Sequence, residues 1–172
     1  MPKDGEIKSG IGASSKRRED VRFLTGNGNY TDDINIRGQA YVFFLRSDVA
    51  HGTLNSVDTS AAAAMPGVVK IFTGADFEAV GGIPCGWLVT DKHGEPMQEP
   101  KHPVLAHGKV RHVGEPIAAV VADSLEQARD AAEAIEVDIS ELSAVINMKD
   151  AFKEGATKVH DDLTSNLCYD WG

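Results

Sequence analysis

Short runs of hydrophobic residues, separated by polar or glycine-containing connections, predict a sheet for most of the chain beyond residue 37. Two of these runs, residues 41–45 and 117–122, contain only apolar residues. Uninterrupted apolar runs are typical of strands that are covered on both faces. Further short strands are predicted at residues 53–57, 68–72, 110–113 and 135–139, of which the last alternates strictly between apolar and polar positions.

The clearest helical pattern follows the second apolar run. Ser124, with Gln127 three residues later, forms a capping box, which is a local signal for the first turn of a helix. The apolar residues after it recur at the spacing of one helical face. They are Leu125, Ala128, Ala131, Ala132 and Ile135. Because most of them are small, we expect this helix to lie close against the sheet.

Two shorter helices are predicted elsewhere. Ser60 is expected to cap the alanine run at residues 61–64, which Pro66 ends. Asn147 and Asp150 form a second capping pair, which predicts a short helix that continues to residue 155.

Two segments lack periodicity. Residues 1–36 are polar and read as an extended N-terminal arm, whereas the connection at residues 81–107 is divided repeatedly by glycine and proline. Irregular connections of that length are usually functional or packed against a partner. The sequence therefore predicts an α+β fold, with a mixed sheet and one or more packed helices, in a domain at residues 37–172 that follows the arm.

Charge and composition exclude several classes of function. The formal net charge of −9 argues against nucleic-acid binding, because phosphate contacts require clustered lysine and arginine. No apolar run is long enough to predict a membrane span. Cys85 and Cys168 lie far apart and form no Cys-x-x-Cys pattern, so we expect free thiols in a reducing cytoplasm.

Histidines and glutamates crowd the region between residues 93 and 115 and suggest a metal site. A site needs three or four ligands that converge on one point, yet no two of these histidines have the i, i+4 spacing of a single helix face. The residues concerned are His93, His102, His107, His112, Glu95, Glu99 and Glu115. We expect exposed loop histidines here, and the sequence assigns no catalytic, cofactor-binding or metal residue in this chain.

Several segments, in order along the chain, resemble the N-terminal a/b hammerhead domain of the large subunit of molybdenum hydroxylases. This is the family of xanthine dehydrogenase, aldehyde oxidase and carbon monoxide dehydrogenase. The matching segments are residues 22–26, 30–34, 46–51, 57–61, 65–69, 103–106, 110–118, 130–138 and 160–162. All of these segments together, at family-like spacing over residues 10–166, form a specific pattern.

The resemblance implies what the parent protein does. It implies an oxidoreductase whose full large subunit binds molybdopterin, while iron–sulfur and flavin partner subunits or domains carry the electrons away. The expected reaction is hydroxylation of an aldehyde or an aromatic heterocycle with oxygen from water, or oxidation of carbon monoxide. Because the family's cofactor-binding residues lie beyond this domain, we expect the chain itself to be a scaffold fragment that contacts the remainder of the large subunit.

The densest part of the resemblance includes Gly114, Glu115 and Pro116, which we predict to be a contact with another domain. Glycine and proline explain a bend before the second apolar run, but a bend requires nothing specific of an acid. We expect Glu115 to be a surface carboxylate that accepts hydrogen bonds from outside this domain. Its replacement by alanine should then change the stability of the isolated chain by less than about 0.5 kcal/mol.

Two alternatives belong to other classes of function. The chain could be a freestanding, non-catalytic binding or assembly module. It could also be a small independent enzyme that uses the histidine-rich loop, which a stoichiometric bound metal would support.

Overall fold

The computed structural model describes residues 10–171, and its contacts divide the chain into two units, Met1–Gln39 and Ala40–Gly172. The described part of the first unit contains a five-residue helix, α1 (Asp20–Leu24), and a 3-10 turn, η1 (Thr31–Asp33). No residue of either element is buried.

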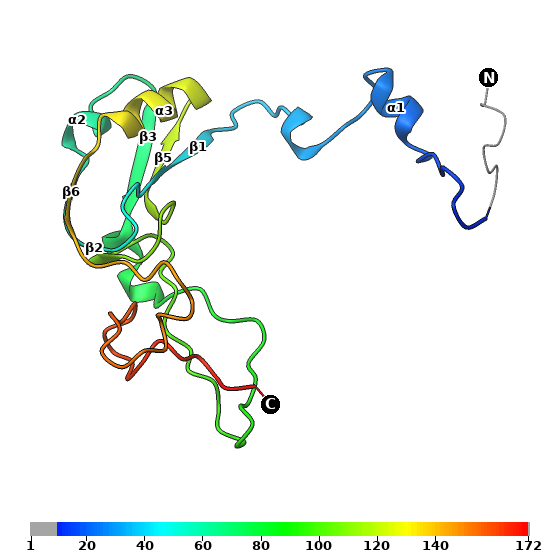
Figure 1. Ribbon diagram of the computed structural model, residues 1–172. Helices are drawn as coiled ribbons and strands as arrows, with labels where there is room; N and C mark the ends of the chain where they lie inside the picture. The colour runs from blue at the N-terminus through cyan, green and yellow to red at the C-terminus, as the bar shows by residue number, and fades with distance from the viewer. Residues whose placement is uncertain (1–9, 172) are drawn as a thin grey trace. The chain divides into compact units, whose positions relative to one another are not determined.

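The second unit contains two three-stranded sheets, and every strand pair in them is antiparallel. The first sheet has the order β1 (Tyr41–Arg46), β5 (Pro116–Ala122), β3 (Val68–Thr73), and the second has the order β4 (Lys109–Val110), β2 (Gly52–Asp58), β6 (Glu136–Glu141). Helices α2 and α3 lie together at one end of the first sheet (Figure 1). The predicted α+β class is confirmed, but two antiparallel sheets replace the mixed sheet that the pattern predicted.

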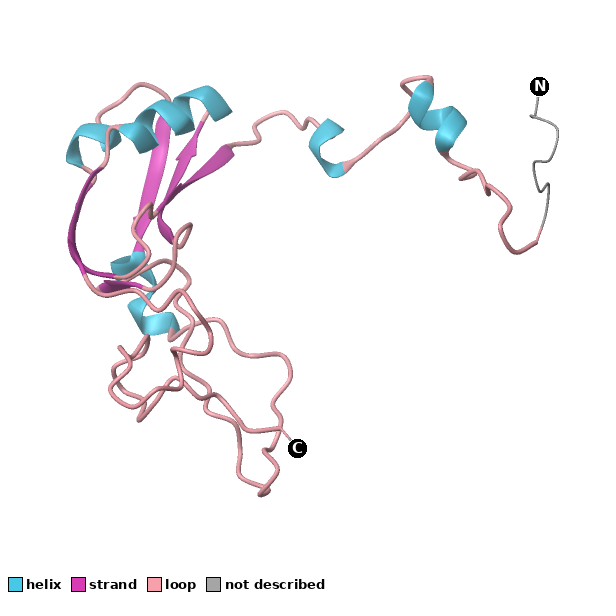
Figure 2. Cartoon of the chain, in the orientation of Figure 1, coloured by secondary structure: helices cyan, strands magenta, loops and turns pink. Residues whose placement is uncertain are grey.

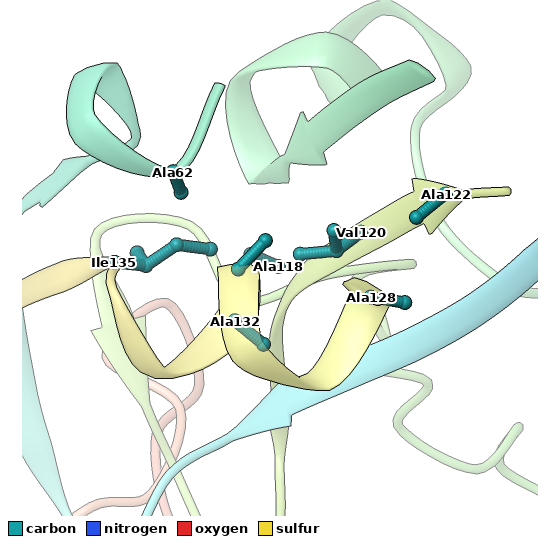
Figure 3. Packing of buried hydrophobic residues seen from close by; sticks show 8 residues of the cluster. Ala62, Ala118, Val120, Ala122, Ala128, Ala132 and Ile135 are labelled. Atoms are coloured by element: carbon teal, nitrogen blue, oxygen red, sulfur yellow. The ribbon is translucent and has the colours of Figure 1, made fainter. Parts of the chain in front are cut away.

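Helix α3 (Leu125–Glu133) packs on the first sheet through its alanines. The Ser124 hydroxyl oxygen accepts a hydrogen bond of 3.2 Å from the Gln127 backbone N–H, as half of the predicted capping box requires. Ala128 and Ala132 are buried and face the strand β5, where Ala118 and Val120 complete the cluster (Figure 3). Side chains this small allow the helix backbone to lie close to the sheet.

Three details of the helix predictions were wrong. Leu125, which the pattern placed on the buried face of α3, is the first residue of the helix and is 42% exposed. Ser60 is the first residue of α2 (Ser60–Ala63), not its cap, and its hydroxyl donates instead to Asp58 at 2.6 Å. Residues 147–155 form successive turns without a helix, closed by backbone bonds such as that from the Asp150 N–H to the Asn147 carbonyl at 2.9 Å.

Strand β1 was predicted to be covered on both faces, and this is also wrong. Its residues alternate between half-buried and exposed along the strand. Phe43 and Leu45 pack against the core with α3, whereas Val42 and Phe44 are 47% and 43% exposed. The run of apolar residues hides this alternation, because both faces of the strand carry hydrophobic side chains.

A second, smaller core lies between the two sheets and supports the turn before β5. It contains Leu54, Ala106, Val110 and Ile117. The 3-10 helix η2 (Gly74–Val80), which the sequence pattern did not predict, follows β3 and leads into the long connection. Residues 81–107 contain no strand or helix apart from isolated bridges, which confirms that this connection is irregular.

This connection and the C-terminal segment together form what we call the irregular lobe, residues 81–107 and 142–171 (Figure 2). The two segments run side by side (Figure 1). Gln98 and Cys168 bond through backbone N–H and carbonyl at 2.9 Å, and the Cys168 thiol donates to the Gln98 carbonyl at 3.0 Å. Lys92 forms an ion pair of 2.5 Å with Asp170. The connection therefore obtains some of its hydrogen-bond partners from residues 168–170, in addition to the bonds that residues 81–107 make among themselves.

Within residues 10–171, no helix has the length and apolar character that crossing a membrane would need.

Candidate contact site at Gly114, Glu115 and Pro116

The turn between β4 and β5 is fastened to the end of β1 by three hydrogen bonds. The Gly114 N–H donates to the Ser47 carbonyl at 2.7 Å, and the Ser47 N–H donates to the Glu115 carbonyl at 2.9 Å. The Arg46 guanidinium donates to the Gly114 carbonyl at 2.8 Å. Gly114 has a φ of 86°, a left-handed backbone conformation that residues with a Cβ adopt at a cost. Glycine at this position is therefore explained by the local backbone.

Pro116 connects the same turn to the second core. It is the first residue of β5, at the point where the register with β1 shifts between Leu45 and Arg46. The carbonyl of Pro116 accepts a hydrogen bond of 2.7 Å from the Ala106 N–H. A proline suits the first position of a strand, because it has no N–H to contribute to the ladder.

Glu115 is only 2% exposed, so the prediction that it is a surface carboxylate of this domain is wrong. Its carboxylate accepts a short hydrogen bond from the Arg111 backbone N–H. One carboxylate oxygen lies 3.9 Å from Nη1 of Arg111, and the other lies 3.9 Å from Nδ1 of His112. A buried carboxylate requires such partners, because transfer from water without them is costly. The hydrogen-bond donor to the Glu115 carboxylate and its two nearest basic side chains thus come from its own turn.

The carboxylate of Glu115 lies in the wall of a cavity of about 270 Å³. The cavity is lined by Pro100, His102, Pro103, Arg111, His112, Glu115, Val159 and His160. Nε of Arg111 is buried and has no hydrogen-bond partner among the described residues. The cavity therefore combines a carboxylate that is bonded within the turn with one donor that is left unpaired.

His160 reaches this cavity from the C-terminal segment, and sequence reasoning did not assign it to the site. The segment is attached to β4 by Lys109, whose ammonium lies 2.7 Å from both carboxylate oxygens of Asp161. Burial lowers the pKa of His160 below its ordinary value of 6.5, and the positive charge of Arg111 lowers it further. No local pattern could have indicated this contact, because the two segments are about fifty residues apart in sequence.

The lowered pKa of His160 predicts a pH dependence of stability. Because the unfolded chain binds the proton more readily, neutral His160 contributes stability that is present above pH 6.5 and is lost as the pH falls below it. We expect His160→Gln to reduce the loss in the free energy of unfolding between about pH 7.5 and about pH 5.5. Urea titrations of wild type and variant at the two pH values measure the free energy of unfolding. His93→Gln, in an exposed turn, is the control, and an unchanged pH dependence in His160→Gln would contradict the prediction.

The predicted histidine-rich region does not converge on one point. His102 and His112 line the cavity with His160, whereas His93 lies in a separate turn whose N–H bonds Asp91 at 2.7 Å. Among the described residues, no group of three or more histidine, cysteine, aspartate or glutamate side chains could hold a metal ion.

Comparison with known proteins identifies relatives of this chain. The family model described as "Aldehyde oxidase and xanthine dehydrogenase, a/b hammerhead domain" matches residues 25–143. The nicotine 6-hydroxylase large subunit of Paenarthrobacter nicotinovorans is 38% identical over 145 residues, which cover 84% of this chain. The carbon monoxide dehydrogenase large chain of Afipia carboxidovorans is 34% identical over 94% of this chain. The solved quinoline 2-oxidoreductase of Pseudomonas putida 86 superimposes with a TM-score of 0.77 at 40% identity.

These relatives are much longer than the region that they share with this chain. The match covers 17% of the nicotine 6-hydroxylase large subunit and 19% of the carbon monoxide dehydrogenase large chain. It covers 90% of this chain and 19% of the quinoline 2-oxidoreductase chain. The chain thus spans less than a fifth of the length of these relatives.

Proposed function

Because the chain belongs to the aldehyde oxidase and xanthine dehydrogenase a/b hammerhead family, we propose that it is the N-terminal scaffold domain of a molybdenum hydroxylase large subunit. The observation that supports this proposal is that the matches cover very different shares of the two proteins. They cover most of this chain but less than a fifth of proteins whose names are those of large subunits. A domain that forms a small part of a large chain packs against the rest of that chain. The proposed partner of this domain is therefore the remainder of the large subunit.

The described residues do not themselves fit a molybdenum cofactor. His102, His112 and His160 line the same cavity as Glu115, but no three of the described side chains are placed to hold one metal ion. We therefore assign this chain no step of the reaction and no cofactor contact.

The activity of the parent enzyme is proposed from its relatives. It is an oxidoreductase reaction at molybdopterin in the large subunit, with oxygen from water inserted into an aldehyde or an aromatic heterocycle, or with oxidation of carbon monoxide. Electrons leave through iron–sulfur and flavin subunits or domains, and the complex is proposed to be cytoplasmic.

Residues 1–36 are proposed to act as an arm and residues 37–172 as the hammerhead domain, with Gly114, Glu115 and Pro116 at the contact with the rest of the subunit. The buried position of Glu115 changes how this contact is formed. The neighbouring Val113 is 63% exposed, and the His112 side chain is 57% exposed. In this proposal the carboxylate is a positioning group that holds the turn, while Val113 and His112 face the partner.

Metal content tests the proposed function in two proteins. We expect the isolated chain to retain no molybdenum, zinc or iron after gel filtration. When the same chain replaces the matching segment of the Pseudomonas putida quinoline 2-oxidoreductase chain, the chimera should retain about one equivalent of molybdenum, because a formed site keeps its metal. Elemental analysis measures both. A chimera without molybdenum, or an isolated chain with a stoichiometric metal, would overturn the proposal.

A further inference from the structure

The first sheet has one face toward the helices and a second face that we call the outer face. Register fixes which residues share each face. Phe43 of β1 and Ile71 of β3 are both paired with Val120 of β5, and all three pack into the core under α3. The intervening residues point the other way, because successive side chains alternate across a strand. They are Val42 and Phe44 on β1, Ala119 and Val121 on β5, and Lys70 and Phe72 on β3.

The outer face is apolar on its central strand β5 and on the adjoining edge strand β1, and it is open along β1. Val42 and Phe44 are 47% and 43% exposed on the edge strand β1, and Val121 beside them is half-buried. Antiparallel sheets with one solvated face usually place polar residues on that face. Hydrophobic side chains from neighbouring strands that form one exposed patch mark a surface that something covers.

Two cations flank the apolar part of the outer face, one on each edge strand. The Arg46 guanidinium carbon lies 5.7 Å from the centroid of the Phe44 ring, and the Lys70 ammonium lies 5.7 Å from the centroid of the Phe72 ring. Neither cation forms an ion pair with an acidic side chain among residues 10–171. In a chain of net charge −9, the outer face thus carries positive charge around a hydrophobic patch.

We infer that the outer face is the docking surface for a later segment of the same large subunit, with apolar residues at its centre and acidic residues toward both edge strands. This inference rests on the proposed function. The relatives have more than four-fifths of their length outside the matched domain, which supplies such a segment. A second copy fits poorly, because two outer faces would bring Arg46 and Lys70 of both copies together and like charges repel.

Phe44→Gln tests the inference in the chimera with the Pseudomonas putida chain. Truncating an exposed apolar side chain of the docking surface removes much of the docking energy, so the yield of molybdenum-loaded chimera should fall by about tenfold or more. Leu125→Gln is the matched control, because Leu125 is equally exposed at 42% but belongs to α3. Lys70→Glu, which reverses one flanking charge, should also reduce the yield. In the isolated chain, Phe44→Gln should leave the melting temperature within about 3 °C of wild type, as expected for an exposed side chain.

The outcomes separate the inference from the proposed function. If the wild-type chimera fails to load molybdenum, the proposed function is wrong. If the wild-type chimera loads and Phe44→Gln loads equally well, only the docking surface is wrong. The oligomeric state of the isolated chain, measured by sedimentation, tests whether a second copy covers the outer face instead. A wild-type dimer that Phe44→Gln dissociates would overturn the inference in favour of a second copy, whereas a monomer in both proteins agrees with it.

Discussion

Gly74→Ala is expected to lower the free energy of unfolding by about 3 kcal/mol, at the upper end of the usual range for overpacked sites. Gly74 is buried at the start of η2, and a Cβ there would lie 2.3 Å from the carbonyl oxygen of Ala106 and 2.8 Å from Cβ of His107. These distances are too short for any side chain. Either the backbone of η2 or that of residues 106–107 has to move.

The backbone near Ala106 has little freedom to move away. Ala106 is 2% exposed in the second core, and its N–H is bonded to the Pro116 carbonyl at 2.7 Å. A displacement would therefore disturb the turn at Glu115 as well. Urea unfolding of wild type and variant measures the loss. Gly86→Ala is the control, because a Cβ there meets nothing within 4 Å, and a similar small change in both variants would contradict the argument.

Glu115→Ala is expected to lower the free energy of unfolding by about 2 kcal/mol, since removing one partner leaves a buried group unsatisfied. Without the carboxylate, the Arg111 backbone N–H loses its acceptor, and the Arg111 guanidinium loses the nearest negative charge. The truncation also enlarges a cavity that is already present at this turn.

Two further variants distinguish these contributions, with urea unfolding as the measurement. Glu115→Gln retains the volume and one acceptor oxygen, so its loss should be smaller than that of Glu115→Ala. Glu133→Ala, at the exposed end of α3, should unfold at nearly the same urea concentration as wild type. If Glu115→Ala behaved like Glu133→Ala, the carboxylate would be a surface group in solution.

The sequence predicted elements whose signals are local. The cap at Ser124, the alanine face of α3 and the apolar run of β5 each depend on neighbouring residues, and each formed as predicted. The exposed face of β1 was not predictable in the same way. Which side of the apolar run at residues 41–45 is covered depends on α3 and β5, which come about eighty residues later.

The same distinction applies to the candidate site. The bend at Gly114 and Pro116 follows from the conformational preferences of glycine and proline, and the structure has a left-handed glycine there. The burial of Glu115 depends on residues 100–103 and 159–160, which the fold brings to the turn from two other segments. Sequence spacing cannot supply that information, and a carboxylate beside a turn therefore appears exposed.

The pairing within the irregular lobe has a consequence for synthesis on the ribosome. Gln98 cannot meet Cys168 until 70 further residues have been made, which takes roughly 4–14 s at 5–20 residues per second. During that time residues 81–107 have left the ribosome without the hydrogen bonds and the ion pair that Cys168 and Asp170 supply. Trp87, which is 80% exposed even in the folded chain, belongs to residues 81–107. The nascent chain should therefore present a binding site for chaperones in this interval, which closes only when Cys168 and Asp170 emerge.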